Sequence, residues 1–410
     1  MGKPSFRSAI PGREFVNRVV ILSGVYPDMR CGCSLHAYRV AQEMSRTQSW
    51  DIQLLTSNHP DIDRSLKHDF ELHPRIDSWR PWRLPNIIDE IERLRPDVLH
   101  VQAPTAAYAG RLHLTMPLLP WAGRRLWHST RLVVTQHDLA IGHRSMQCKH
   151  HLLLRSADAI TVSNDRDFQA IARLSPKTLS RTHRAPLGSL FDSPALDPKE
   201  RHSIRQSLGI EPEDLLIAYF GFLIPSRKIE TIIESARTLS DQQKNIHFLF
   251  MGGTGPGSHS YVEHCKRLAE KHDLTRQIHW TGYLPNHEIE TNLAVSDLFV
   301  SAIERGADFR NSTLIAAMNA GLPILTTQNR RYGIDRELEQ SGACLFFDPD
   351  SPSSLAQSIQ KMAQNPSLRL EMSNRARERA QQHTWPRHAS VLDRAYRGLP
   401  PEPGNELSIP

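Results

Sequence analysis

Short runs of apolar, β-branched residues recur along the chain and predict buried strands. The first run covers residues 18–23 and ends at Gly24. Apolar runs of this length, without regular polar alternation, are typical of strands that are covered on both faces of a parallel sheet. Further runs of this kind in the first half of the chain lie at residues 52–56, 98–102, 132–135 and 159–163.

A loop and a helix are predicted directly after the first strand. In residues 35–44, apolar side chains recur at a spacing that places them on one face of a helix. Strand, loop and helix therefore form one βα unit. In the loop, Cys31 and Cys33 flank Gly32, a spacing that matches no common zinc site and favours a tight turn.

The second half of the chain repeats the α/β pattern. Residues 187–198 contain turn formers and two prolines and are interpreted as a linker between two domains. A length of 410 residues also favours two domains, here residues 1–192 and 193–384, each resembling a Rossmann fold. After the linker, strands are predicted at residues 215–220, 246–251, 278–280, 298–300, 323–327 and 343–347.

Composition narrows the class of protein. Apolar residues make up 39% of the chain and charged residues 23%, as in folded globular proteins. No apolar run approaches the roughly 20 residues that cross a bilayer, and no signal peptide opens the sequence, so a cytoplasmic location is expected. Five cysteines, an odd number, argue against a disulfide framework.

The net charge of +6 is compatible with nucleic acid, anionic lipid or phosphorylated substrates. The most basic stretch, residues 369–382, mixes both signs at helical spacing, which favours a solvated helix face over a nucleic-acid contact. The 21 histidines are scattered without metal-ligand spacing, so no metal is expected.

Several loops are expected at the carboxyl ends of the predicted strands. In open parallel sheets these loops and the following helix N-termini bind ligands, anions in particular. These loops contain the candidate ligand-binding residues of the chain. The loops concerned are residues 30–34, 136–138, 221–228, 252–257 and 305–313.

In order and spacing, these motifs resemble those of the retaining, GT-B-fold glycosyltransferases of family 4, the glycosyl transferases group 1. The resemblance covers nearly the whole chain. It implies an α/β fold in which two Rossmann-like domains face each other across a cleft. The segments that carry it are the loops at residues 30–34 and 136–138 and residues 157–163, 221–231, 251–256, 280–285 and 316–323.

The resemblance also implies a reaction. A sugar would move from a nucleotide-diphosphate sugar to an acceptor hydroxyl with retention of the anomeric configuration, in the synthesis of a glycan, glycolipid or glycosylated metabolite. No metal and no other cofactor is expected, because cations and backbone amides would stabilise the leaving diphosphate.

On the donor side, Arg227 matches the family's diphosphate-binding lysine, and Lys228 stands where glycine is usual. The alternative is that both are surface cations at a helix start. Phe222 replaces a second family cation, normally an arginine. Gly32 would let the first-domain loop approach the diphosphate, or would simply permit a turn.

The family's acidic motif is altered. Asp308 and Ala316 stand where two glutamates are usual, so Asp308 alone would position the transferred sugar. Glu304 has the wrong spacing to replace the second glutamate. Side chains that would help to bind the donor, or simply cap a helix, are Asn311, Ser312 and Thr313.

Three further predictions follow from the resemblance. His137 would contact the donor sugar; on its own it reads as a packed or solvated histidine. The loops that contain Gly253, Tyr283 and Leu284 would line the donor site. Trp385 follows Thr384 in a family pattern that packs the last segment, residues 385–410, back onto the first domain.

The altered acidic motif leaves a second function open, that of a catalytically weak or inactive relative that binds a glycan or scaffolds an enzyme. For an active enzyme, the acceptor would be a glycan, a lipid-linked molecule or a small molecule. The basic charge adds peripheral contact with an anionic membrane, at the inner face, as a further hypothesis. Nucleic acid is not an expected partner.

Overall fold

The computed structural model describes residues 17–24, 32–60, 62, 67–103, 115–123, 129–140, 144–240, 245–255, 257–328 and 335–403. The chain divides into two compact units. One comprises Met1–Pro186 together with Trp385–Pro410, and the other comprises Leu187–Thr384. The division falls at the start of the predicted linker, a few residues before the predicted boundary at residue 192.

Within the described residues, the first unit contains a seven-stranded parallel sheet in the order β3-β2-β1-β4-β5-β6-β7. The five strands that the apolar runs predict are confirmed as β1, β2, β4, β5 and β6. Both edge strands, β3 and β7, were not predicted. Their bounds are β1 Asn17–Ser23, β2 Trp50–Ser57, β3 Glu71–Ile76, β4 Val98–Ala103, β5 Arg131–Gln136, β6 Ala159–Val162 and β7 Thr182–Arg184.

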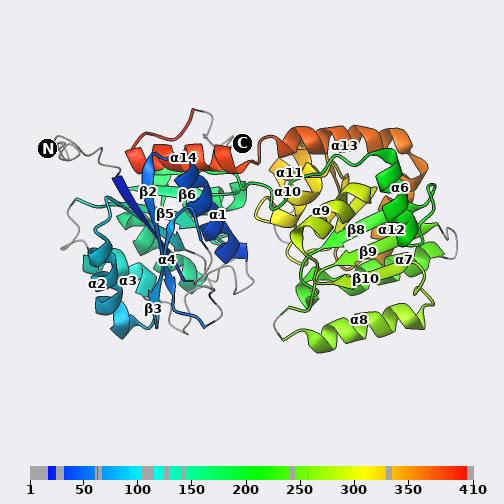
Figure 1. Ribbon diagram of the computed structural model, residues 1–410, viewed down its shortest axis with the longest axis horizontal. Helices are drawn as coiled ribbons and strands as arrows, with labels where there is room; N and C mark the ends of the chain where they lie inside the picture. The colour runs from blue at the N-terminus through cyan, green and yellow to red at the C-terminus, as the bar shows by residue number, and fades with distance from the viewer. Residues whose placement is uncertain are drawn as a thin grey trace. The chain divides into compact units, whose positions relative to one another are not determined.

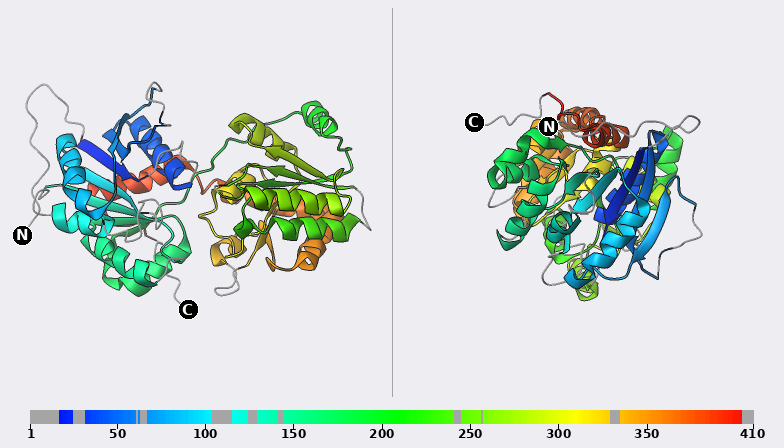
Figure 2. Two further views of the ribbon diagram at one scale, coloured as in Figure 1. Left: turned by 90° about the horizontal axis from the view of Figure 1, so that it is seen from below. Right: turned by 90° about the vertical axis from the view of Figure 1, so that its left-hand side faces the viewer.

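Helices cover both faces of this sheet (Figures 1 and 2). One face packs against α1 and α14, with Ile21, Val40 and Leu392 in the core between them. Thus α14, which follows the second unit in sequence, completes the core of the first (Figure 1). The helices of this unit are α1 Gly32–Arg46, α2 Leu84–Leu94, α3 Thr115–Gly123, α4 Arg144–Ser156, α5 Asp165–Leu174 and α14 Trp385–Arg397.

In the second unit, the described residues form a six-stranded parallel sheet in the order β10-β9-β8-β11-β12-β13. All six predicted strands of this half are confirmed. The strands are β8 Leu215–Phe220, β9 Ile246–Met251, β10 Ile278–Gly282, β11 Leu298–Ser301, β12 Ile324–Thr327 and β13 Cys344–Phe347. The helices are α6 Pro198–Ser207, α7 Ile229–Ser240, α8 His259–Lys271, α9 Asn286–Val295, α10 Ser312–Asn319, α11 Arg336–Gln340, α12 Pro352–Gln364 and α13 Pro366–Ala380.

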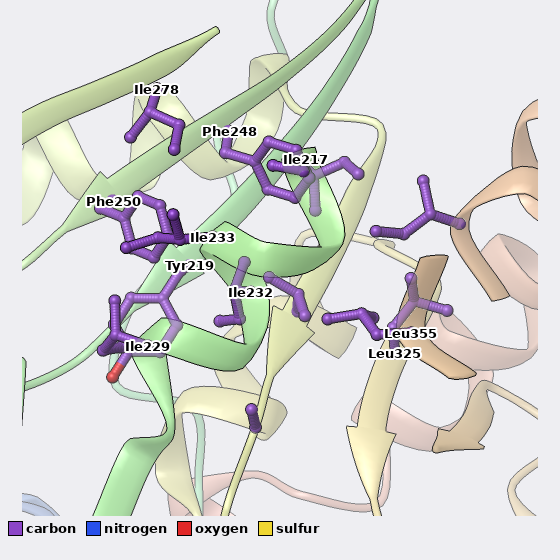
Figure 3. Packing of buried hydrophobic residues seen from close by; sticks show 14 of the residues in the cluster. Ile217, Tyr219, Ile229, Ile232, Ile233, Phe248, Phe250, Ile278, Leu325 and Leu355 are labelled. Atoms are coloured by element: carbon purple, nitrogen blue, oxygen red, sulfur yellow. The ribbon is translucent and has the colours of Figure 1, made fainter. Parts of the chain in front are cut away.

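The helix α7 shows how sequence pattern places a helix on this sheet. Its apolar residues Ile229, Ile232 and Ile233 recur at helical spacing and are fully buried. Figure 3 shows them packed against Tyr219 of β8 and Phe250 of β9. This packing fixes the N-terminus of α7, and with it the loop that joins β8 to α7.

In each sheet, the strand order reverses beside the first strand, between β1 and β4 and between β8 and β11. Loops on the two sides of such a reversal diverge, and open α/β sheets bind ligands at the carboxyl ends of the strands there. The candidate ligand-binding residues of each unit lie at these carboxyl ends. Among the described residues, no helix combines the length and apolar character that crossing a bilayer demands.

Candidate functional site

In the second unit, the loops after β8, β9 and β10 are joined by backbone hydrogen bonds. The N–H of Gly221 donates to Met251 O at 3.0 Å, and that of Gly252 donates to Gly282 O at 3.0 Å. Gly252 has φ of +147°, and a Cβ at this position would lie 2.0 Å from Gly221 O. Only glycine allows this approach. The three loops are therefore held together at the carboxyl ends of their strands.

Tyr283 covers Gly253. A Cβ on Gly253 would lie 1.9 Å from the Tyr283 ring, so the ring rests on the bare backbone. The Tyr283 ring centroid also lies 6.5 Å from that of Phe222, and the residue is 52% exposed. Leu284, by contrast, packs against the hydrophobic core. Of these predicted donor-binding residues, Tyr283 and Gly253 form a surface, whereas Leu284 supports it from below.

Arg227 ends the short 3-10 helix η4 (Pro225–Arg227), between β8 and α7. Its side chain is partly buried, and it forms no ion pair with any residue that the structure describes. Burial raises the pKa of the neighbouring Tyr219, and the positive charge of Arg227 opposes that rise. A cation that no described carboxylate compensates, at the carboxyl ends of the strands, is suited to bind an anion.

Lys228 has a different environment. Its Nζ lies 2.8 Å from Asp350 Oδ1 and 4.0 Å from Glu304 Oε1. The hydrogen bond to Asp350 raises the Lys228 pKa. Its backbone is left-handed, with φ of 44° and ψ of 48°, a conformation that favours glycine. The backbone of Lys228 is therefore strained, and the charge of its side chain is compensated by two carboxylates.

The loop after β11 approaches the loop after β8, because the N–H of Glu304 donates to Ser226 O at 3.0 Å. Within it, Asp308 is fully buried. Its carboxylate accepts from Arg310 Nε at 2.9 and 3.1 Å, from Arg310 Nη2 at 2.5 Å and from the backbone N–H of Arg310 at 2.9 Å. A carboxylate has about four acceptor positions, so Arg310 takes up those of Asp308.

The helix α10 begins directly after this loop. Asn311 is its N-cap residue but makes no side-chain capping bond, because Asn311 Oδ1 accepts from the Asp308 N–H at 3.0 Å. Ser312 and Thr313 form its first turn and are partly buried. Thr313 lies beside Gly221, since a Cβ on that glycine would be 3.9 Å from Thr313 Cγ2. The positive end of the α10 dipole therefore lies next to the β8 loop.

The position of the second family glutamate is part of the core. Ala316 is 3% exposed and packs among the apolar residues of α10 and β11. Glu304 does not replace this glutamate, because its side chain is half exposed and faces Lys228.

In the first unit, His137 directly follows β5 and is nearly buried. Its Nε2 lies 2.9 Å from Oε1 of Gln102, a residue of β4. The same oxygen lies 3.0 Å from Nδ1 of His36, in the first turns of α1. The ring centroids of His36 and His137 are 4.9 Å apart, and that of His388, on α14, is 5.0 Å from His36. We call these four residues the histidine cluster.

Burial, followed by the neighbouring histidines, holds the pKa of His36 well below its ordinary value of 6.5. Burial likewise lowers the pKa of His388 to about 4. Both rings are therefore neutral at pH 7. The sequence pattern indicates His137 but neither Gln102 nor His36. Their only sequence signal is their place, at the end of a predicted strand and the start of a predicted helix.

Gly32 is the first residue of α1, so the position predicted to approach a diphosphate lies at a helix N-terminus. The preceding residues 25–31, including Cys31, and the Cys33 side chain lie outside the described part of the chain. Among the described residues, no group of three or more histidine, cysteine, aspartate and glutamate side chains has a metal-binding arrangement.

Residues 200–379 match the family model described as glycosyl transferases group 1. The chain is 23% identical over 310 residues to a sulfoquinovosyl transferase of Arabidopsis thaliana, which covers 73% of this chain and 56% of the relative. It is 22% identical over 297 residues to the D-inositol 3-phosphate glycosyltransferase of Corynebacterium efficiens, which covers 67% of each. This chain thus spans about half the length of the first relative.

The structure resembles that of HepE from Anabaena, solved in complex with UDP and glucose. The TM-score is 0.73 at 15% identity, and the match covers 93% of this chain and 99% of HepE. At this identity the likeness concerns the fold. Residues 200–379 are thus similar to the glycosyl transferases group 1 family, in a chain whose two Rossmann-like units have the GT-B fold.

Proposed function

We propose that the chain transfers a sugar from a nucleotide-diphosphate sugar to an acceptor hydroxyl, with retention of the anomeric configuration. One observation carries the proposal. Arg227, which pairs with no described carboxylate, lies at the sheet edge where the N-terminus of α10 adjoins the β8 loop. The matched family model spans both elements. HepE, which has the same fold, is solved with UDP and with UDP-glucose.

In this proposal, Arg227 and the first N–H groups of α10 bind the diphosphate. As the sugar leaves, negative charge grows on the diphosphate, and fixed positive groups stabilise that charge most strongly in the transition state. Lys228 contributes less, since Asp350 already compensates it. These groups would supply the charge that a metal ion supplies in other transferases, so we propose a reaction without a metal or other cofactor.

The sugar would be held by the loop after β11, with Asn311, Ser312 and Thr313 as hydrogen-bonding side chains. Asp308 accepts a sugar hydroxyl only when Arg310 moves off its carboxylate, because that carboxylate is taken up. His137 is proposed as a further sugar contact. Tyr283 and Gly253 offer a flat surface on which a nucleobase can stack.

For the acceptor, we propose a molecule at an anionic membrane surface, such as a lipid-linked glycan. Trp82 and Trp121 of the first unit are 66% and 75% exposed, and tryptophan together with basic residues favours the membrane interface. Co-sedimentation with vesicles of anionic and of neutral lipid tests this. Replacement of both tryptophans by serine is expected to abolish binding to the anionic vesicles, and equal binding before and after replacement would contradict it.

The central experiment measures binding and turnover of UDP-, GDP- and dTDP-sugars by NMR, with and without EDTA. We expect one donor to bind, its anomeric configuration to be retained in the product, and EDTA to have no effect. Arg227→Met is expected to weaken binding of that donor. If no donor in the panel binds or turns over, the proposal is wrong.

A second function is favoured by two specific observations: Ala316 is a core residue, and Arg310 neutralises Asp308. As a result, the site has no second carboxylate at position 316 and its first carboxylate is already paired. Arg227 and α10, which would bind the donor, are unaffected. The chain would then bind a nucleotide sugar or glycan without transferring it. Donor binding without any turnover, across a panel of acceptors, would establish this alternative.

A further inference from the structure

We propose that His36 is a second ligand-binding histidine of the first unit, and that its Nε2 accepts a hydrogen bond from a carbohydrate hydroxyl. The inference rests on the proposed function and adds a residue to it. Its basis is the arrangement of protons in the histidine cluster, which can be worked out from the partners of each ring nitrogen.

The orientation of the Gln102 amide comes first. Its Nε2 lies 3.3 Å from Nε2 of His100, and its Oε1 faces both His36 and His137. His100 Nδ1 is 2.7 Å from the Tyr396 hydroxyl, to which the ring can donate. Its Nε2 therefore accepts from the Thr135 hydroxyl at 2.7 Å and from the Gln102 amide. The Gln102 amide therefore donates toward His100, and its oxygen accepts from two rings.

The tautomers follow from this orientation. Because Gln102 Oε1 only accepts, His36 must carry its proton on Nδ1. His388 does the same, since its Nδ1 lies 2.9 Å from the carbonyl oxygen of Pro186. In a neutral ring, the other nitrogen then bears a lone pair. Nε2 of His36 and Nε2 of His388 are thus two hydrogen-bond acceptors.

Neither lone pair has a partner among the described residues, although both rings are buried. His36 is 5% exposed and His388 is 1% exposed, and both Nε2 atoms are buried without a hydrogen bond. Buried acceptors are normally satisfied by a donor. Two buried acceptors on rings whose centroids are 5.0 Å apart, without a donor among the described residues, fit a molecule that brings O–H groups.

The place of the cluster indicates a ligand. Gln102 and His137 are at the carboxyl ends of β4 and β5, and His36 is in the first turns of α1, beside the strand-order reversal between β1 and β4. Open α/β sheets bind ligands at these carboxyl ends, beside a reversal of strand order. A carbohydrate is the class of ligand that offers several hydroxyls, and it comes here either from the donor or from the acceptor.

The test is ¹⁵N NMR of the histidine side chains in the whole protein. In the free protein, we expect Nδ1 of His36 to be protonated and Nε2 to show the shift of a bare lone pair. On addition of the donor that binds, among UDP-glucose, GDP-mannose and dTDP-glucose, Nε2 of His36 is expected to shift toward a hydrogen-bonded value. Free glucose that produces the same shift would assign the site to an acceptor sugar.

Variants provide a second readout. His36→Phe keeps an aromatic ring but removes the Nε2 acceptor together with the Nδ1 donor to Gln102, and is expected to weaken sugar binding about tenfold. Gln102→Leu should free both tautomers, whereas Gln102→Glu keeps the acceptor oxygen and adds a charge. Gln102→Glu should therefore retain binding but move its pH dependence to higher pH, a change that a purely structural role for Gln102 would not produce.

The chain offers a matched control. His73 Nε2 lies 2.6 Å from Gln53 Oε1, a histidine–glutamine pair of the same type on strands β3 and β2. His73→Phe should leave sugar binding unchanged. If a donor binds but the His36 Nε2 signal does not respond to donor or glucose, a buried water is its partner and the inference is wrong. If no donor binds at all, the proposed function fails, and the inference fails with it.

Discussion

Arg310 binds the carboxylate of Asp308 through its side chain and its backbone at the same time. Asp308 is almost inaccessible, and the side chain of Arg310 is 16% exposed. The charge that this pair presents outward is therefore the positive one. Asp308, which the family resemblance suggests as a ligand of the transferred sugar, is the buried partner of a cation.

The Asp308–Arg310 pair predicts unequal effects of two substitutions. Arg310→Met removes the charged side-chain hydrogen bonds of a buried carboxylate and is expected to lower the free energy of unfolding by about 3 kcal/mol. Asp308→Asn keeps an acceptor for the Arg310 backbone N–H, and the Arg310 side chain is the more exposed of the two partners, so the loss should be less than half as large. Urea unfolding measures both. Equal losses would show that the carboxylate does not depend on Arg310.

Arg227 and Lys228 are adjacent in sequence but differ in charge compensation. Arg227→Met should weaken UDP binding about tenfold or more, because a charged hydrogen bond to the diphosphate is lost. Lys228→Met should change it by less than about threefold, because Lys228 is already paired with Asp350. Isothermal titration calorimetry with UDP gives both values. A larger effect at Lys228 would reverse their assigned roles.

The left-handed backbone of Lys228 predicts a difference between two small substitutions. Glycine adopts φ near +44° without cost, whereas alanine retains the strain of a Cβ. Both substitutions remove the same side chain. Lys228→Gly should therefore be more stable than Lys228→Ala by about 1 kcal/mol, measured by urea unfolding. Equal stabilities would mean that the loop relaxes when the side chain is absent.

Alanine substitutions at the two adjacent glycines after β9 are predicted to change the stability of the protein by different amounts. In Gly252→Ala, the new Cβ meets the backbone oxygen of Gly221, which cannot move without breaking the joined loops, so a loss of stability of about 3 kcal/mol is expected. In Gly253→Ala, the Cβ meets the half-exposed Tyr283 ring, which can swing into solvent. Thermal unfolding should therefore change little for Gly253→Ala. A similar loss in both variants would contradict this distinction.

The buried histidines of the first unit predict loss of stability in acid. Burial lowers the pKa of His100 to about 3 and that of His388 to about 4, and it lowers the pKa of His36 well below 6.5. His137 and the Tyr396 hydroxyl are the titratable groups that face them. Between about pH 6.5 and pH 4, the unfolded chain binds protons that the folded unit does not. The free energy of unfolding should therefore fall with decreasing pH, by about 1.4 kcal/mol per pH unit for each histidine.

Urea unfolding at a series of pH values measures this slope. His100→Gln removes one titrating group and should reduce the slope. A stability that is constant from pH 7 to pH 5 would show that the rings are protonated in the folded state.

The sequence predicts the interior strands of both sheets because apolar, β-branched runs report burial on both faces. It does not predict the edge strands of the first unit. β3 carries Glu71, His73 and Pro74 among its six residues, and β7 has three residues. At a sheet edge, one side of the strand has no ladder partner and polar residues and proline are tolerated, so the pattern that identifies interior strands is missing.

For the site, the sequence locates the loops but not the partners of their side chains. Lys228 was placed where glycine is usual, and the left-handed backbone explains that usage. The pairing of Asp308 with Arg310 was not predicted, because a side chain that turns back two residues leaves no periodic signal. Gln102 was missed because an interior strand hides one polar residue among apolar ones. It became visible only when β4, β5 and α1 were placed side by side.

The position of α14 has a consequence for synthesis. The first unit needs Leu392 and Tyr396 for its core, and these residues are made only after the whole second unit. Translation proceeds from the N-terminus, so the second unit, which is continuous in sequence, has all of its residues first. Until α14 is made, α1 alone covers the sheet face that the two helices share, and a chaperone that shields the α14 side of that face during the interval would raise the yield of folded protein.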